Sequence, residues 1–170
     1  MKKIIMVLGI ILSITLMTII FTYSAQDKQT VTEQKAPIVD VITSHDTTFE
    51  EKTEAEKQDA INIYDYYISK TVHVLEYGAL CLFLCMALIL IKKRWLLYLL
   101  AVVISTSYAI LDEVHQKFVA DRTARQLDVF FDLGGALICI LGLELIYTIY
   151  HFFMIKRKYQ ASLVWRRKWW

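Results

Sequence analysis

The residues best suited to chemistry in this chain stand at one end of its hydrophobic segments and form two sets. The first set is Lys70, His73, Glu76 and Tyr77. Residues three and four apart share one helical face at 3.6 residues per turn, so this set forms a single stripe. The second set is Asp112, Glu113, Gln116, Arg122, Asp128 and Asp132. Together they offer cations for phosphate or carboxylate groups, acceptors for sugar or peptide hydrogen bonds, and a histidine for proton transfer.

Four apolar stretches must position these groups. The stretches are residues 4–23, 72–91, 95–111 and 129–155. The first stretch runs for twenty residues without a charge and the third for seventeen, and about 20 apolar residues cross a bilayer as a helix. Charged groups are costly at membrane depth unless they face a partner or water, which makes the two sets a candidate site. The sequence therefore predicts an all-α fold, an integral membrane bundle of four transmembrane helices.

Basic residues flank the apolar stretches in three clusters, at residues 2–3, 92–94 and 156–158. Basic clusters next to membrane-spanning helices stay in the cytoplasm, so both termini are predicted to be cytoplasmic. Residues 24–69 then form a long extracytoplasmic loop that is acidic, with ten acids against four lysines. Because no A-x-A-like cleavage site follows the first stretch, we expect it to be an uncleaved anchor.

Residues 1–155 are expected to form the membrane domain, and residues 156–170 a basic, tryptophan-rich cytoplasmic tail suited to anionic lipid headgroups. Within the outer loop, residues 24–49 show no sustained period and are expected to be irregular. Residues 50–69 favour a helix that runs into the second apolar stretch, with Thr47 or Thr48 as its N-cap.

Several other residues have ordinary structural interpretations. Three tyrosines are expected at the water–lipid boundary: Tyr64, Tyr66 and Tyr67. The three cysteines, Cys81, Cys85 and Cys139, lie in apolar helices without metal-ligand spacing and are expected to pack in the core. His115 is interpreted as a solvated loop histidine. Gly134 and Gly135 remove side-chain bulk where another helix can approach.

The charged groups also have an alternative interpretation as a clamp between helix ends. Lys70 with Glu76, and Arg125 with Asp128, are close enough in sequence to form ion pairs that only stabilise helices. Membrane helices more often pack through small and apolar residues, so a clamp alone does not explain the whole set. Both interpretations stay open at this stage.

The motifs around these residues resemble the VanZ family of bacterial membrane proteins. The resemblance rests on Ser24-Ala25-Gln26, the Lys70-x-x-His73-x-x-Glu76-Tyr77-x-x-Leu80 run, the Asp112-Glu113-x-x-Gln116-x-Phe118 run, and Arg122 followed by Asp128, Asp132 and Gly135. It covers roughly residues 1–150. It implies a multi-pass protein of the cytoplasmic membrane in Gram-positive bacteria, with a role in the cell envelope and in resistance to the antibiotic teicoplanin.

Three features depart from the family pattern. The outer loop is long where the family has a short one, and Ala120-Asp121 replaces Pro-Gly before Arg122. Asp132 stands where the family often has asparagine, which adds a negative charge to the site. These departures bear on the identity of the ligand and leave the expected fold unchanged.

Three functions are compatible with this sequence. The first, which we favour, is a non-enzymatic envelope protein whose ten-residue polar site binds a lipid-linked cell-wall precursor or a lipoglycopeptide. The second is a membrane enzyme acting on a lipid phosphate of the undecaprenyl phosphate class, with His73, Glu76 and Asp112 as catalytic candidates. The third is a small transporter, in which Glu144 and His151 extend a polar relay inward.

The expected partners are membrane lipids, and the chain lacks a nucleic-acid recognition motif. No cofactor is predicted. A divalent cation remains compatible with the ligand types of Asp112, Glu113 and Asp128, because hard cations choose oxygen ligands. The sequence carries no signal for a particular oligomeric state.

Overall fold

The computed structural model describes residues 1–119 and 126–167, with side chains described for residues 1–119 and 127–158. The described residues form five helices: α1 (Lys2–Ser24), α2 (Lys28–His45), α3 (Glu54–Ala87), α4 (Arg94–Gln116) and α5 (Gln126–Arg167). None of these residues forms a strand. Four of the helices, α1, α3, α4 and α5, are long and apolar enough to cross a membrane. The prediction of an all-α fold with four candidate spans is therefore confirmed.

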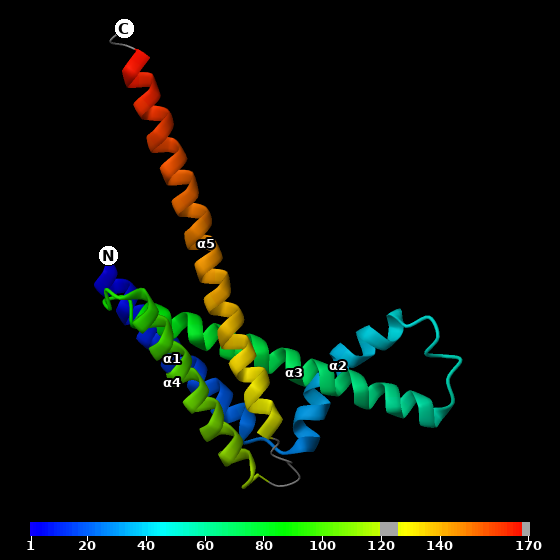
Figure 1. The fold of residues 1–170 in the computed structure, drawn as a ribbon. Coiled ribbons are helices and arrows are strands. Elements are labelled where there is room, and N and C mark those ends of the chain that lie inside the picture. The colour runs from blue at the N-terminus through cyan, green and yellow to red at the C-terminus, as the bar shows by residue number, and fades with distance from the viewer. Residues whose placement is uncertain (120–125, 168–170) are drawn as a thin grey trace.

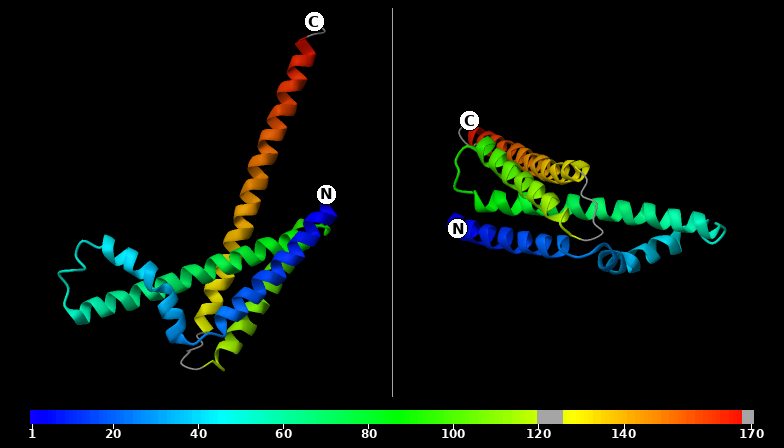
Figure 2. Two further views of the ribbon diagram at one scale, coloured as in Figure 1. Left: turned by 180° about the vertical axis from the view of Figure 1, so that it is seen from behind. Right: turned by 90° about the horizontal axis from the view of Figure 1, so that it is seen from below.

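Helix α3 is the centre of the bundle and contacts each of the other four helices. Seen from below, α1 lies on one side of α3 while α4 and α5 lie on the other (Figure 2). The N-terminus and the α3–α4 connection lie together at one end (Figure 1), which we call the basic end because it carries Lys2, Lys3, Lys92 and Lys93. The ends of α1 and α4 and the start of α5 meet at the opposite end, the polar end (Figure 1).

Two helices end at other residues than the predicted spans. Helix α3 ends at Ala87, whereas the apolar stretch continues to Ile91. Helix α5 continues beyond residue 155 to Arg167, so the first part of the predicted tail is helical. At 1.5 Å per residue its 42 residues are about 63 Å long, roughly twice the thickness of a bilayer core. Its C-terminal half projects away from the other helices (Figure 1).

The expectation of an irregular segment at residues 24–49 is wrong, because α2 occupies residues 28–45. Asp27 caps this helix, and its carboxylate accepts a hydrogen bond from the Thr30 backbone N–H at 2.8 Å. That bond lowers the pKa of Asp27. Pro37 lies inside the helix, where it removes one backbone donor, and α2 is visibly bent (Figure 1). On α2, Val39 is the buried residue, and the helix packs on α3.

The expected helix leading into the second span is confirmed, but the N-cap predicted for it is wrong. The cap is Thr53, which exchanges hydrogen bonds with Glu56 in a capping box. Thr48 instead donates from its backbone N–H and its hydroxyl to Asp46. Thr48 therefore stabilises the turn that precedes the helix.

Asp46 ties the α2–α3 connection to the face of α3. Lys52 donates to its carboxylate at 2.5 Å, and the Tyr64 hydroxyl donates at 3.2 Å. These bonds hold the pKa of Asp46 well below its ordinary value, with Lys52 as the largest cause, and the same contact raises the pKa of Lys52. A carboxyl whose pKa is lowered by folding stabilises the fold fully at pH values above its ordinary pKa. This contribution is lost progressively as the pH falls from the ordinary pKa to the lowered one.

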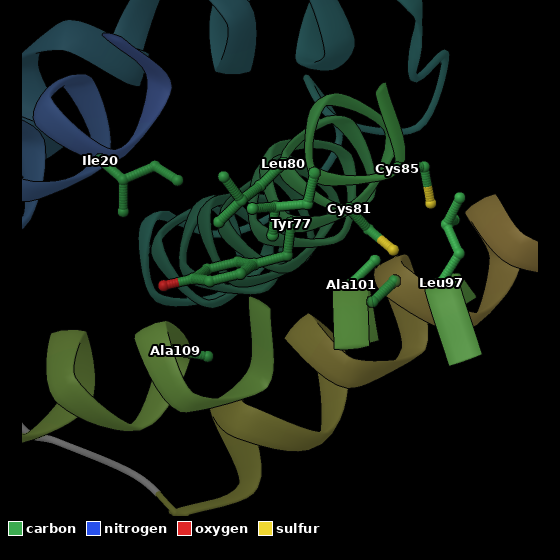
Figure 3. Close-up of a cluster of buried hydrophobic side chains, with 10 residues drawn as sticks. Ile20, Tyr77, Leu80, Cys81, Cys85, Leu97, Ala101 and Ala109 are labelled. Atoms are coloured by element: carbon green, nitrogen blue, oxygen red, sulfur yellow. The ribbon is translucent and has the colours of Figure 1, made fainter. Parts of the chain in front are cut away.

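The core lies where α3 meets α1, α4 and α5. Tyr77 and Leu80 of α3 are fully buried there, together with Cys81. Figure 3 shows Cys81 near Leu97 and Ala101 of α4. Cys81, Cys85 and Cys139 are free thiols that belong to or pack against this core, so the prediction that they are packing residues is confirmed.

A close approach of backbones fixes the crossing of α3 and α5. A Cβ atom added to Gly135 would lie 2.2 Å from the Val74 carbonyl oxygen, and one added to Gly78 would lie 3.2 Å from the Gly135 carbonyl oxygen. Around Gly134 a Cβ would meet nothing within 4 Å. The expectation of a close approach is therefore confirmed for Gly135 and wrong for Gly134.

Candidate functional site

The crossing of α3 and α5 brings the predicted cations of α3 against the predicted acids of α5. Lys70 pairs through its Nζ with an Asp128 carboxylate oxygen. Both residues are only 9% exposed. The Lys70 ammonium also lies 5.3 Å from the ring centroid of Tyr66 and 5.6 Å from that of Phe131, distances at which aromatic faces attract cations. Lys70 is therefore engaged between two helices and does not pair with Glu76.

One turn further along both helices, His73 meets Asp132. The His73 Nδ1 atom lies 3.1 Å from Asp132 Oδ1. Asp132 is 3% exposed, whereas the side chain of His73 is 19% exposed. The imidazole is parallel to the Tyr77 ring within 10°, with centroids 6.4 Å apart. A carboxylate at one ring nitrogen fixes the orientation of the imidazole and favours a proton on that nitrogen.

The polar end of α4 contributes a second group of buried side chains. Gln116 donates from Nε2 to Asp112 Oδ2 at 3.0 Å, and Glu113 is buried beside them. His115 belongs to the last turn of this helix and stacks on Phe21 with ring centroids 4.4 Å apart. The interpretation of His115 as a loop histidine is therefore wrong.

A pocket of about 710 Å³ opens between α1, α2, α3 and α4 at the polar end. Four of the predicted site residues line it: His73, Glu76, Asp112 and Gln116. The rest of its wall comes from Ile20, Tyr23, Ser24, Val31, Gln34, Lys35, Ile38, Ser69 and Val72. The volume falls within the range of small-ligand pockets. Polar groups of α3 and α4 and apolar side chains of α1, α2 and α3 therefore share one wall.

The other predicted site residues that the structure describes do not line this pocket. Lys70 and Asp128 form an ion pair between α3 and α5, and Tyr77 lies in the core. Asp132 contacts the pocket residue His73. Arg122 and Arg125 lie outside the described residues. Within the described residues no three His, Cys, Asp or Glu side chains come together as metal ligands, so Asp112, Glu113 and Asp128 do not form such a group.

Helix α2 supplies the part of the pocket that sequence reasoning missed. Lys35 binds Asp65 at 2.7 Å and donates to the Ser69 hydroxyl at 2.8 Å, which holds α2 against α3. The lining residues Val31, Lys35 and Ile38 recur four and three residues apart. That spacing is the helical signal that was available, and Pro37 and the polar composition of the segment obscured it.

Replacing Lys35 with methionine is expected to loosen α2 from α3. The change removes an ion pair whose side chains are 16% and 29% exposed and one hydrogen bond, a loss of about 1 kcal/mol. Backbone amides of α2 should then exchange with deuterium roughly fivefold faster. Hydrogen-exchange mass spectrometry would measure this rate, with the exposed Lys28 of the same helix, also changed to methionine, as the matched control. Equal rates in both variants would contradict the expectation.

Glu144, which the transport hypothesis required, is engaged elsewhere. Its Oε1 lies 2.8 Å from Arg94 Nε, and the Arg94 guanidinium stacks 3.8 Å from the Tyr147 ring centroid. This ion pair joins the start of α4 to α5. It explains the presence of Glu144 without a proton relay. Transport therefore gains no support from Glu144.

A comparison with known protein families gives a match. No curated protein and no solved structure gives a match to the chain. The sequence does match the VanZ/LLP1 family over residues 8–151. These residues include all of α2, α3 and α4, most of the first and last candidate spans, and every predicted site residue. On the strength of this match the chain belongs to the VanZ/LLP1 family.

Proposed function

We propose that this protein binds the polar headgroup of an amphiphilic envelope molecule at the extracytoplasmic face of the bacterial cytoplasmic membrane, and that this binding contributes to teicoplanin tolerance. The observation that carries the proposal is the pocket itself. Buried polar groups line one part of it and apolar side chains line another. A lipid-linked cell-wall precursor or a lipoglycopeptide has the same division between a polar head and an apolar chain.

The proposed orientation is supported by the distribution of charge. Lys2, Lys3, Lys92 and Lys93 gather at the basic end, as expected for the cytoplasmic side of a membrane protein. The pocket lies at the opposite end, where the spans would emerge outside the cell. Exposed apolar side chains cover α1 and much of α5, which suits contact with lipid.

Growth inhibition by teicoplanin and by vancomycin in a susceptible Gram-positive host tests this function. Cells expressing the wild type should tolerate more teicoplanin than cells without the protein, and His73→Ala should abolish the difference because it removes a pocket residue. Glu54→Gln, which changes a side chain 93% exposed at the far end of α3, is the matched control. Equal teicoplanin susceptibility with and without the wild type, at verified membrane levels, would contradict the role in tolerance.

The His73–Asp132 pair favours one alternative, catalysis on a lipid phosphate. A histidine oriented by a carboxylate can act as a general acid or base toward a group in the pocket. The corresponding assay follows phosphate release from undecaprenyl phosphates by the purified protein. Release that Asp132→Asn slows at constant KM would support the enzyme, and no release would remove it.

A further inference from the structure

Helix α2 forms one wall of the pocket and is held against the bundle by few buried side chains. Its residues Val31, Gln34, Lys35 and Ile38 line the pocket. Val39 is its buried residue, and most of its other side chains are exposed. A segment with few buried apolar contacts opens at a low free energy. We therefore expect α2 to move more easily than the four candidate spans.

Both ends of α2 are tied to other helices. At its start, residues 25–27 connect it directly to α1. At its end, Asp46 is bound by Lys52 and Tyr64, which ties the α2–α3 connection to α3. Pro37 lies inside the helix, which is bent between these two ends (Figure 1). When a bent helix turns about the line that joins its ends, its middle is displaced most, and the middle of α2 lines the pocket.

One lysine holds the middle of α2 against α3. The Lys35 ammonium binds Asp65 at 2.7 Å and donates to the Ser69 hydroxyl at 2.8 Å. We call this pair of interactions the Lys35 contact. The side chains of the ion pair are partly exposed, at 16% and 29%, and ion pairs that water can reach are weak. A weak contact at this position allows the middle of α2 to leave α3 and to return.

We propose that α2 is a movable wall of the pocket and that the Lys35 contact keeps this wall closed. This inference rests on the proposed function, because it names what controls access to the same pocket. When the Lys35 contact breaks, the middle of α2 turns outward and a headgroup can enter or leave. When it forms again, the headgroup is enclosed between α2 and the polar residues of α3 and α4.

The rate at which a thiol in the pocket reacts with a water-soluble reagent tests this movement. Ser24 lines the pocket and is 5% exposed, so Ser24→Cys places a sheltered thiol there. The full-length protein in phosphatidylcholine nanodiscs is treated with charged methanethiosulfonates, and the protein without the added thiol gives the background of the native cysteines. Adding Lys35→Met should raise the rate about fivefold, because the open arrangement becomes that much more populated.

A second variant separates movement of α2 from a change of charge. Lys35→Met removes a positive charge and Asp65→Asn removes a negative one, so a purely electrostatic effect on a charged reagent would have opposite signs in the two variants. Opening of the wall should speed the reaction in both variants, with a cationic and with an anionic reagent. Lys28→Met, at an exposed position of the same helix, should react as the Ser24→Cys parent does.

Exchanging the two charges tests the Lys35 contact itself. Lys35→Asp and Asp65→Lys should each speed the reaction, and the two together should return the rate toward that of the parent. Helix content, measured by circular dichroism, should be unchanged in Lys35→Met, because α2 turns without unfolding. A loss of helix content would show that α2 unfolds, and the movable wall would then be wrong.

The outcomes also distinguish this inference from the proposed function, because the thiol reaction needs no ligand. If Lys35→Met and Asp65→Asn react as slowly as the parent, the Lys35 contact does not control the pocket and the inference is wrong, whatever the growth assay gives. If both react faster but the wild type gives cells no tolerance to teicoplanin, the movable wall stands and the role in tolerance fails.

Discussion

Replacing Lys70 with methionine is expected to destabilise the protein by about 3–5 kcal/mol, the range for removing one partner of a buried ion pair. The variant leaves the Asp128 carboxylate, 9% exposed, without its partner inside the α3–α5 interface. It also removes the cation from between the rings of Tyr66 and Phe131. Reversible unfolding of the purified protein by dodecyl sulfate in mixed micelles would measure the loss.

A double variant separates the charge effect from a packing effect. Lys70→Met combined with Asp128→Leu removes both charges, and it should recover most of the lost stability because an apolar pair can replace a buried ion pair. Lys57→Met is the control, since Lys57 pairs with side chains 91% and 93% exposed and should cost less than about 1 kcal/mol. If the double variant is no more stable than Lys70→Met, the pair does not act through an uncompensated charge.

Gly135→Ala is expected to destabilise the bundle by about 3 kcal/mol, the upper part of the range for overpacking. The new Cβ would lie 2.2 Å from the Val74 carbonyl oxygen, so α5 must move away from α3. That movement would also separate His73 from Asp132 and weaken any ligand binding that depends on the pocket. Thermal unfolding in detergent, followed by circular dichroism, measures the change in stability.

Gly134→Ala supplies a control one residue away. A Cβ there meets nothing within 4 Å, and alanine is favoured over glycine in a helix by about 1 kcal/mol. This variant should therefore be as stable as wild type or slightly more stable. Equal destabilisation by both substitutions would show that the close approach of α3 and α5 at Gly135 is not the cause of the lost stability.

The fold was predictable where composition alone decides it. The four apolar stretches identified four candidate spans, and Gly135 identified a close helix approach. The N-cap of α3 was predicted wrongly for a clear reason. Thr47, Thr48 and Thr53 each have glutamate three residues later, so all three fit the capping pattern. The contacts decide between them, because Thr53 forms the capping box with Glu56 while Thr48 binds Asp46.

The site was predictable as a set of residues but not as a set of pairs. The spacing within α3 placed Lys70, His73 and Glu76 on one face, yet their partners depend on how α5 is rotated against α3. The contact between Gly135 and Val74 sets that rotation, and it directs Asp128 and Asp132 to Lys70 and His73. Sequence separation of 59 residues between His73 and Asp132 gave no local signal for this pairing.

That separation has a consequence for how the chain is made. Lys70 and His73 belong to α3, whereas their acidic partners belong to α5, which is synthesised last. At about 5–20 residues per second, 59 residues of synthesis take roughly 3–12 s. During that interval the nascent α3 carries charges that no other helix has yet neutralised. We therefore expect the α3–α5 pairs to form only after α5 has been synthesised, so that the bundle is completed late.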